Sequence, residues 1–253
     1  MLAMMPVSDA TLIGHWAFDE GSGVTAGDSS PGGANPGAIA NATWGSDSTR
    51  SSYLVFNGSN AIVDPSLTLP VMTSANDFTW AFWANSQEAI GQTQQNAIMV
   101  GNRHNGAGTN TDFAPRQFIK FTPRQFEWHQ EGNGADNLDV PDLVVGEWHH
   151  HAIVKTGNSL QYFFDGMSVG SVATLSQAPG IAQHPFFIGG EPGAGGNEYF
   201  NGYLDDVRIY DQALSASEVL ALAIPESSSL LLSVFGFMLL GAIRRSAHDC
   251  VHP

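Results

Sequence analysis

Short runs of hydrophobic residues, separated by turn-forming residues, follow one another along most of the chain. We predict strands at residues 12–18, 53–56, 61–63, 78–84, 97–101, 117–121, 125–128, 148–155, 159–164, 167–173, 186–189 and 203–210. Many short strands with turn-rich connections are typical of a sandwich or a barrel. The pattern predicts an all-β fold, and within that class we expect a two-sheet antiparallel jelly-roll sandwich with one core.

Three local patterns add detail to this expectation. Residues 78–84 (FTWAFWA) are too continuously apolar for a solvent-facing strand, so we expect that strand to cross the core. The dipeptides Asn57-Gly58 and Asp165-Gly166 predict two tight hairpins. Pro-Arg-Gln-Phe occurs at residues 115–118 and again at 123–126, which we interpret as two paired strands.

The polarity pattern changes after residue 210. Ser215 and Glu218 have the spacing of a capping box, which predicts a short helix through Leu222 that closes the domain. Residues 223–229 form a linker with one proline, and from Leu230 to Ile243 the chain is apolar. We predict a hydrophobic membrane or sorting helix over residues 230–245, followed by a tail at 246–253. A buried helix of the domain is the alternative.

The two ends of the chain point to export. Residues 1–11 resemble the last part of a signal peptide, so we expect the true start codon to lie upstream. The apolar run at the other end is short for a membrane span, which needs roughly 20 residues. Arg244 and Arg245 would keep the C-terminus inside and leave the domain at residues 12–222 outside.

Composition excludes one class of partner and permits another. With 9 Lys and Arg against 24 Asp and Glu, the net charge is −15, so no basic surface is available for nucleic acid. The acidic residues offer the oxygen ligands that calcium prefers. Cys250 is the only cysteine, so no disulfide forms within the chain.

An ordered set of segments resembles the laminin-G-like jelly-roll domains of the concanavalin A-like lectin and glucanase superfamily. The resemblance covers residues 12–222. It is carried by residues 14–23 (GHWAFDEGSG), 28–30 (DSS), 56–59 (FNGS), 78–83 (FTWAFW), 146–150 (GEWHH), 162–166 (YFFDG), 200–210 (FNGYLDDVRIY) and 213–215 (ALS). It implies the same sandwich fold and an extracellular binding role.

The C-terminal segment resembles the PEP-CTERM sorting signal of bacterial exosortase systems. Pro225 and Glu226 correspond to the start of the Pro-Glu-Pro motif, although Ser227 replaces the second proline. Arg244 and Arg245 follow the apolar run, as in that signal. The resemblance implies export, recognition by exosortase-type sorting machinery, and display at the cell surface or in the extracellular matrix.

A structural calcium ion is the cofactor that the family resemblance implies. Asp28, in a glycine-rich loop, and Asp205, on the last long strand, resemble its ligands, with Asn35 and Asn57 as further candidates. Loop carbonyl groups and water would complete the six to eight oxygens that calcium needs. The alternative is that Asp28 caps a local turn and that Asp205 pairs with a nearby arginine such as Arg208.

Two other groups of polar residues suggest chemistry. His149-His150-His151 cannot converge on one metal ion, because neighbouring residues of a strand point to opposite faces. We therefore expect a structural or surface role for these histidines. Glu127 and Glu131 have the spacing of the two glutamates of laminarinase-like glycosidases, but His129 stands where that motif has aspartate. Glycoside hydrolysis by this pair is the enzymatic alternative.

Aromatic residues in loops are the candidates for ligand binding, because a sugar ring stacks on an aromatic face. Trp44, Tyr199 and Phe200 are such candidates, and each is equally well explained by packing under a loop. We predict a non-catalytic, exported surface module that binds glycan or a surface protein. A glycoside hydrolase and a purely structural matrix protein are the alternatives.

Overall fold

The computed structural model describes residues 10–69, 77–88, 97–102, 118–129, 135–139, 144–173, 184–192 and 198–225. The suggested signal-peptide remnant therefore lies almost wholly outside the described residues. Glu226, the apolar run from Leu230 to Ile243, Arg244 and Arg245 lie outside them as well. No helix within the described ranges is long and apolar enough to cross a membrane.

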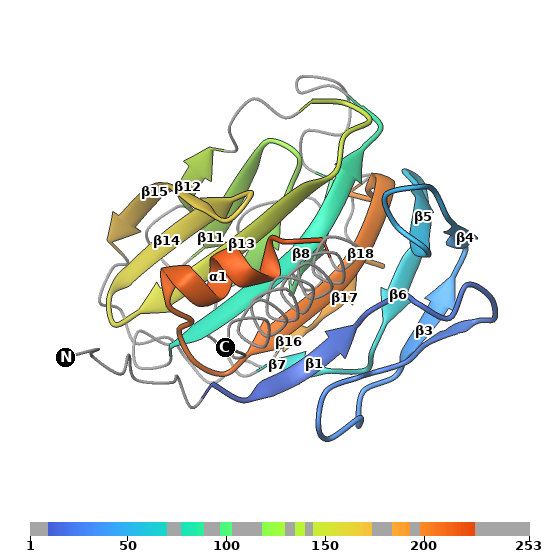
Figure 1. Cartoon of the computed structure of the whole chain (residues 1–253), viewed down its shortest axis with the longest axis horizontal. Helices are drawn as coiled ribbons and strands as arrows, with labels where there is room; N and C mark the ends of the chain where they lie inside the picture. Colours follow the sequence, from blue (N-terminus) through green and yellow to red (C-terminus); the bar gives the residue numbers. More distant parts are fainter. Residues whose placement is uncertain are drawn as a thin grey trace, which may run out of the picture.

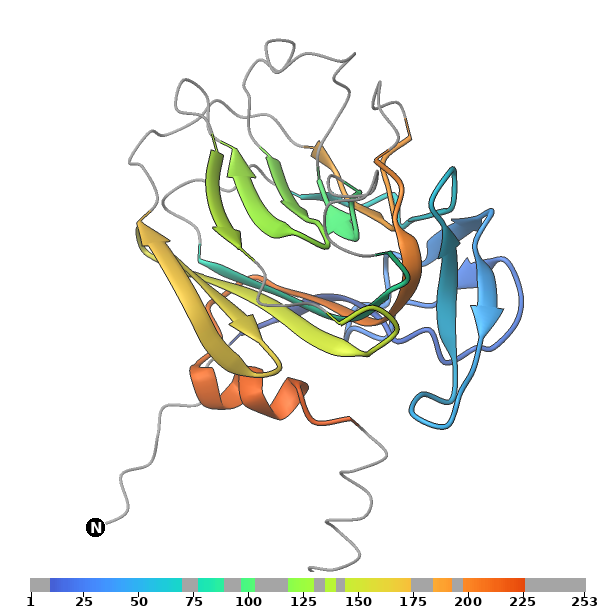
Figure 2. The same cartoon turned by 90° about the horizontal axis from the view of Figure 1, so that it is seen from above.

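Two antiparallel sheets face each other and enclose the main core (Figures 1 and 2). Sheet A has the order β15-β14-β13-β8-β18-β5-β4, and β1 also pairs with β18. Its strands are β1 (Leu12–Trp16), β4 (Thr43–Gly45), β5 (Tyr53–Asn57), β8 (Phe78–Ser86), β13 (His149–Thr156), β14 (Ser159–Phe164), β15 (Met167–Ala173) and β18 (Asn201–Tyr210).

Sheet B has the order β12-β11-β10-β9-β17-β6-β3-β2. Its strands are β2 (Thr25–Ala26), β3 (Gly37–Ala40), β6 (Ile62–Asp64), β9 (Val100–Gly101), β10 (Phe118–Phe121), β11 (Gln125–His129), β12 (Ala135–Asp139) and β17 (Phe187–Ile188). The short strands β7 (Thr68–Leu69) and β16 (His184–Pro185) form a separate pair. The expected antiparallel two-sheet sandwich is confirmed.

Strand β8 is buried along its whole length, which explains its continuous apolar sequence. Alternate side chains, including Trp80 and Phe82, point into the core between the sheets. The other side chains point away from sheet B: Ala81 belongs to a second apolar cluster, and Trp83 lies under Arg50. Both faces of this strand are therefore covered, as the aromatic run predicts.

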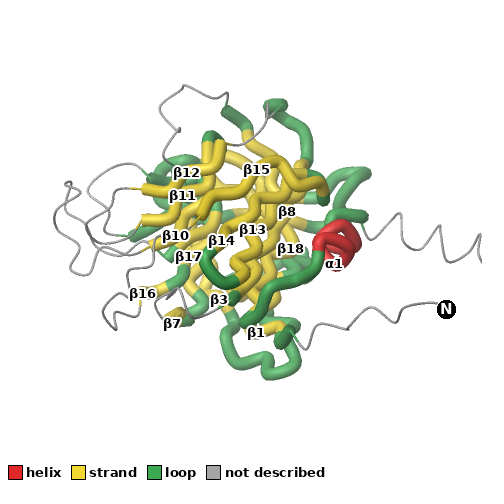
Figure 3. Tube along the Cα trace, turned by 90° about the vertical axis from the view of Figure 1, so that its left-hand side faces the viewer, coloured by secondary structure: helices red, strands yellow, loops and turns green. Residues whose placement is uncertain are grey.

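Helix α1 (Ala216–Leu222) packs on the face of sheet A that points away from sheet B (Figures 2 and 3). Ser215 and Glu218 form the predicted capping box at its first turn. Val219 is fully buried and packs in the second apolar cluster, which includes Ala81, Ala152 and Phe163. We call this face the outer face of sheet A.

Two of the expected strand pairs are confirmed. Asp165 and Gly166 both have positive φ angles, 49° and 76°, which a type I′ turn requires, and they join β14 to β15. Phe118 and Phe126, the last residues of the two Pro-Arg-Gln-Phe segments, lie on β10 and β11, which pair antiparallel. The first pairing was predicted from turn chemistry and the second from the repeated segment, and both are local signals.

The hairpin expected at Asn57-Gly58 is wrong. Strand β5 ends there in sheet A, whereas β6 belongs to sheet B, so the two strands do not pair. The Asn57 carboxamide oxygen accepts the backbone N–H groups of Ser59, Asn60 and Ala61 at 2.9–3.2 Å. This capped turn carries the chain from one sheet to the other, and the neighbouring strands decide where each partner pairs.

Candidate functional site

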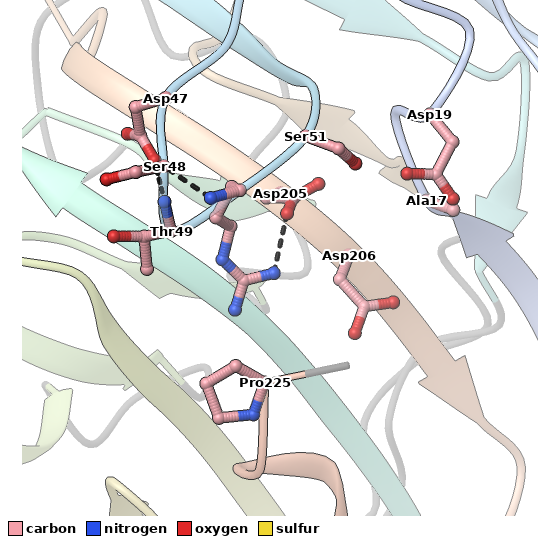
Figure 4. A pocket seen from close by; sticks show the side chains of 10 residues that line it. Ala17, Asp19, Asp47, Ser48, Thr49, Ser51, Asp205, Asp206 and Pro225 are labelled. Atoms are coloured by element: carbon pink, nitrogen blue, oxygen red, sulfur yellow. Dashed lines mark hydrogen bonds and ion pairs between the residues drawn. The ribbon is translucent and has the colours of Figure 1, made fainter. Parts of the chain in front are cut away.

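A pocket of about 380 Å³ opens on the outer face of sheet A. The loop at residues 46–52, between β4 and β5, forms one wall, and β18 forms another (Figure 4). The lining residues are Ala17, Asp19, Asp47, Ser48, Thr49, Arg50, Ser51, Asp205, Asp206 and Pro225. We call it the Arg50 pocket, because Arg50 is the only positively charged side chain among the described residues that line it.

An irregularity in β18 brings two consecutive acidic residues to this pocket. Successive residues of a regular strand point to opposite faces. Here the register with β8 shifts between Asp205 and Arg208, and Asp206 has a φ of 52°. This bulge allows Asp205 and Asp206 to line the same pocket.

Arg50 and Asp205 form a buried ion pair at the centre of the pocket. Arg50 Nη1 donates to Asp205 Oδ2 at 2.6 Å, and the two side chains are only 8% and 7% exposed. Burial raises the pKa of Asp205 to about 7, although the charge of Arg50 acts in the opposite direction. Removing the carboxylate from water is thus the dominant effect on its protonation.

The guanidinium group of Arg50 rests on aromatic rings. Its central carbon lies 4.2 Å from the centroid of the Trp83 ring and 5.3 Å from that of Trp148. Tyr53 meets Trp148 edge-on at 5.2 Å and stacks on Tyr203 at 5.0 Å. Such cation–π contacts hold an arginine in one orientation and stabilise it where water is scarce.

Asp47 shapes the loop that carries Arg50. Its carboxylate accepts the backbone N–H groups of Thr49 at 2.7 Å and Arg50 at 2.8 Å, and the indole N–H of Trp148 at 3.3 Å. Burial alone would raise the pKa of Asp47, but these hydrogen bonds lower it below its ordinary value. The loop is therefore fixed by an ionised aspartate.

Several polar atoms of the pocket have no hydrogen-bond partner among the described residues. They are Nε and Nη2 of Arg50, Oδ1 of Asp205 and Oγ of the neighbouring Ser52. A buried donor or acceptor without a partner costs about 1–3 kcal/mol. The pocket thus contains hydrogen-bond donors on Arg50 and an acceptor on Asp205 that have no partner among the described residues.

Asp206, in contrast, has two charged or polar partners outside the pocket lining. Its Oδ1 lies 2.7 Å from His15 Nε2 and 2.9 Å from Arg208 Nη2. Burial would raise the pKa of Asp206, but the hydrogen bond to His15 and the charge of Arg208 keep it below the ordinary value. Asp206 therefore contributes a fixed negative charge to the pocket wall.

The calcium candidates all have partners within the protein. Asp28 accepts the backbone N–H groups of His15, Ser30 and Asn35 at 2.9–3.1 Å, and the Asn35 amide also donates to it at 3.4 Å. This agrees with the turn-capping alternative for Asp28. Asp205 pairs with an arginine, as its alternative held, but this partner is Arg50, and Arg208 pairs with Asp206. Within the described ranges, no three His, Cys, Asp or Glu side chains are grouped as metal ligands.

Calcium binding remains a prediction from the sequence, and thermal unfolding tests it. An ion that binds only the folded state raises the melting temperature in proportion to its affinity and concentration. We expect millimolar calcium to raise the melting temperature of the wild type and to have less effect on Asp28→Asn. Equal melting temperatures of the wild type in calcium and in chelator would contradict the predicted calcium binding.

The remaining polar candidates lie elsewhere. Glu127 is buried opposite Lys120 in the β10–β11 pairing, 3.3 Å from its ammonium group, and it accepts from Gln125 at 2.8 Å. Glu131 lies outside the described residues. His149 and His151 both contact the ring of Phe164, whereas His150 meets Trp83 on the outer face. The three histidines therefore alternate as predicted.

Two of the three aromatic candidates, Trp44 and Phe200, pack within the protein. Trp44 lies on β4 rather than in a loop, packs against the main core, and donates its indole N–H to the Gly23 carbonyl at 2.9 Å. Phe200 is fully buried in that core. Tyr199 is half-buried beside Gly190. The burial of Phe200 excludes it as an exposed ligand-binding residue in a loop.

Sequence reasoning missed the residues that form the pocket. Arg50, Asp47 and Trp148 were not singled out, and Trp83 was assigned only to the core. One signal was available: Arg50 is one of only 9 Lys and Arg residues and stands in a polar loop, Asp47-Ser48-Thr49-Arg50-Ser51-Ser52. Its partner Asp205 lies 155 residues away, so local patterns could not pair them.

Comparisons with solved structures agree with the fold. Domain 4 of AbnA, a GH43 extracellular arabinanase from Geobacillus stearothermophilus in complex with arabinotriose, matches with a TM-score of 0.61 and 19% identity, over 85% of this chain and 99% of that one. The binding domain of Paraclostridial Mosquitocidal Protein 1 matches at 0.58 and 18%, over 84% and 52%. Trypanosoma rangeli sialidase in complex with sialic acid matches at 0.59 and 16%, over 88% and 34%.

These identities establish a shared fold and no more. A search of curated proteins found no match. The sequence profile of the Laminin_G_3 family, described as the concanavalin A-like lectin/glucanases superfamily, matches residues 56–220, which is more than half of the chain. The chain therefore belongs to the concanavalin A-like lectin/glucanases superfamily.

Proposed function

We propose that this protein is a non-catalytic glycan-binding module and that the Arg50 pocket is its binding site. The observation that carries the proposal is the buried Arg50–Asp205 pair, whose remaining donors and acceptor have no partner among the described residues. Each sugar hydroxyl can both donate and accept a hydrogen bond, so it suits a wall that offers both kinds of group. In this proposal a bound sugar supplies the missing partners.

The size and surroundings of the pocket support this proposal. Its volume of about 380 Å³ falls within the range of small-molecule sites. Trp83 and Trp148 hold the arginine rigidly, so little side-chain entropy is lost on binding. Among the proteins of similar fold, the arabinanase domain is in complex with arabinotriose and the sialidase with sialic acid. A saccharide is therefore the ligand class that we favour over a protein.

A glycan screen with a blocking variant tests the proposal. Ser51 is exposed and lines the pocket, so Ser51→Trp should fill the pocket and leave the Arg50–Asp205 pair in place. We expect saturable binding of at least one oligosaccharide by the wild type and an affinity at least about tenfold lower in Ser51→Trp, equivalent to about 1.4 kcal/mol. Arg124→Ala, in the exposed turn between β10 and β11, is the matched control.

Two results would contradict this function. Binding that survives Ser51→Trp would place the site elsewhere on the sandwich. Shortening of the glycan during incubation, lost in Glu127→Gln, would favour the hydrolase instead. We also propose that the protein acts outside the cell and is displayed there through the C-terminal segment predicted at residues 223–245. A full-length chain found only in the cytoplasm would contradict that part.

A further inference from the structure

The charges around the Arg50 pocket restrict the sugars that can enter it. Among the described residues, four carboxylates line the pocket, from Asp19, Asp47, Asp205 and Asp206, and Arg50 is the cationic side chain of the lining. Arg208 pairs with Asp206 from beside the pocket, so the carboxylates still outnumber these two guanidinium groups. Asp47 is ionised by its hydrogen bonds and Asp206 by His15 and Arg208, so neither charge is lost at neutral pH. The whole chain carries a net charge of −15. An acidic sugar would therefore meet like charges on approach and in the pocket, which costs affinity.

A cationic sugar fits the centre of the pocket no better. The unmet groups on Arg50 are N–H donors, at Nε and Nη2, and they need an acceptor. An ammonium group has only donors, so it would leave Arg50 unsatisfied and would place a second positive charge beside it. The ligand group that matches Arg50 must offer a lone pair.

Two neighbouring, uncharged hydroxyl groups can satisfy both the donors of Arg50 and the acceptor of Asp205. One hydroxyl oxygen can accept from Arg50, while the other donates its proton to Asp205 Oδ1, which has no partner among the described residues. The two parallel N–H bonds of a guanidinium edge suit two adjacent oxygen atoms. Because Arg50 is already held by Trp83 and by Asp205, this edge is oriented before a ligand arrives.

We propose that the Arg50 pocket selects uncharged sugars with adjacent hydroxyl groups and rejects acidic sugars. The inference rests on the proposed glycan-binding function and names its ligand class. Asp19 is the selectivity residue at the exposed rim of the pocket. Asp19 and the loop carrying Arg50 lie outside residues 56–220, whereas Asp205 and Asp206 lie inside them, so the pocket combines the family-matched region with a segment before it.

The test compares charged and uncharged oligosaccharides by calorimetry on the full chain. The uncharged probes are arabinotriose, cellotriose and maltotriose; the acidic probes are trigalacturonate and sialyllactose; the cationic probe is the glucosamine trimer. We expect at least one uncharged probe to bind, with an affinity that changes little between low and high salt, because its binding involves no ion pair. We expect every acidic and cationic probe to bind at least about tenfold more weakly, equivalent to about 1.4 kcal/mol.

A variant isolates the contribution of charge. Asp19→Asn removes one negative charge at the rim and keeps the size of the side chain. It should raise the ratio of acidic-probe affinity to uncharged-probe affinity by roughly twofold to fivefold at low salt, the scale of one partly screened charge. Arg124→Ala, far from the pocket in an exposed turn, should change neither affinity.

The possible outcomes distinguish a wrong ligand class from a failure of the proposed glycan-binding function. If acidic or cationic probes bind best and lose affinity in Ser51→Trp, the pocket binds glycans but the ligand class is wrong. If Asp19→Asn leaves the ratio of acidic to uncharged affinity unchanged at low salt, the selectivity does not come from the rim. If no probe binds the wild type, the proposed function and the inference both fail.

Discussion

Arg50→Ala is expected to lower the free energy of unfolding by about 3–5 kcal/mol, because it leaves the buried carboxylate of Asp205 without its partner. The variant also removes the cation that covers the faces of Trp83 and Trp148. Urea unfolding, followed by tryptophan fluorescence, measures the change. An effect of this size is a large fraction of the stability of an ordinary domain.

Replacement of both partners should be much less harmful than replacement of Arg50 alone. In Arg50→Met with Asp205→Leu, no buried charge remains and the apolar side chains fill similar volume, so we expect a stability close to that of the wild type. This double variant should fold and should still lose glycan binding. Arg124→Ala, which is exposed, should change the stability by less than about 0.5 kcal/mol. An Arg50→Ala variant as stable as Arg124→Ala would show that the ion pair contributes little.

Lowering the pH from 7 to 5 is expected to destabilise the protein through two buried histidines. Burial lowers the pKa values of His150 and His151 from 6.5 to about 3. Between these values the unfolded chain binds protons that the folded chain does not, so the free energy of unfolding falls as the pH falls. The loss between pH 7 and pH 5 is about 2 kcal/mol for each histidine.

Asp205 opposes this loss over the same pH range. Its pKa is raised from 3.8 to about 7, so the folded chain binds a proton here that the unfolded chain releases. Stability from this residue is therefore present at pH 5 and is lost as the pH rises through 7, an effect of about 2 kcal/mol. The wild type should lose only about 1–2 kcal/mol between pH 7 and pH 5, the sum of these opposing contributions.

Two variants separate the opposing effects in urea unfolding at pH 5, 6 and 7. Asp205→Asn removes the compensation, so its loss between pH 7 and pH 5 should grow to about 4 kcal/mol. His150→Phe keeps an aromatic ring against Trp83 and should reduce the loss by about 2 kcal/mol relative to the wild type. If the Asp205→Asn curve runs parallel to the wild-type curve, Asp205 is ionised in the folded protein throughout this range.

Features that are encoded locally could be predicted from the sequence. The capping box of α1 lies within one helical turn, and the type I′ turn at Asp165-Gly166 needs only two residues that tolerate positive φ. The aromatic run in β8 indicated a strand that is covered on both faces. The short strands β2, β3, β4, β7, β12 and β16 were not predicted, because two to five residues with little hydrophobic pattern become strands only beside a partner.

The sequence by itself thus determined the class of fold and the helix that closes it, because both follow from hydrophobic pattern and turn chemistry. Only the tertiary structure decided that the chain changes sheets at Asn57, since this depends on which strands lie alongside. It also decided the pocket: a bulge in β18 turns Asp205 and Asp206 to one side, and a loop 155 residues away places Arg50 against Asp205. Such long-range contacts are set by strand register and packing, which no local pattern specifies.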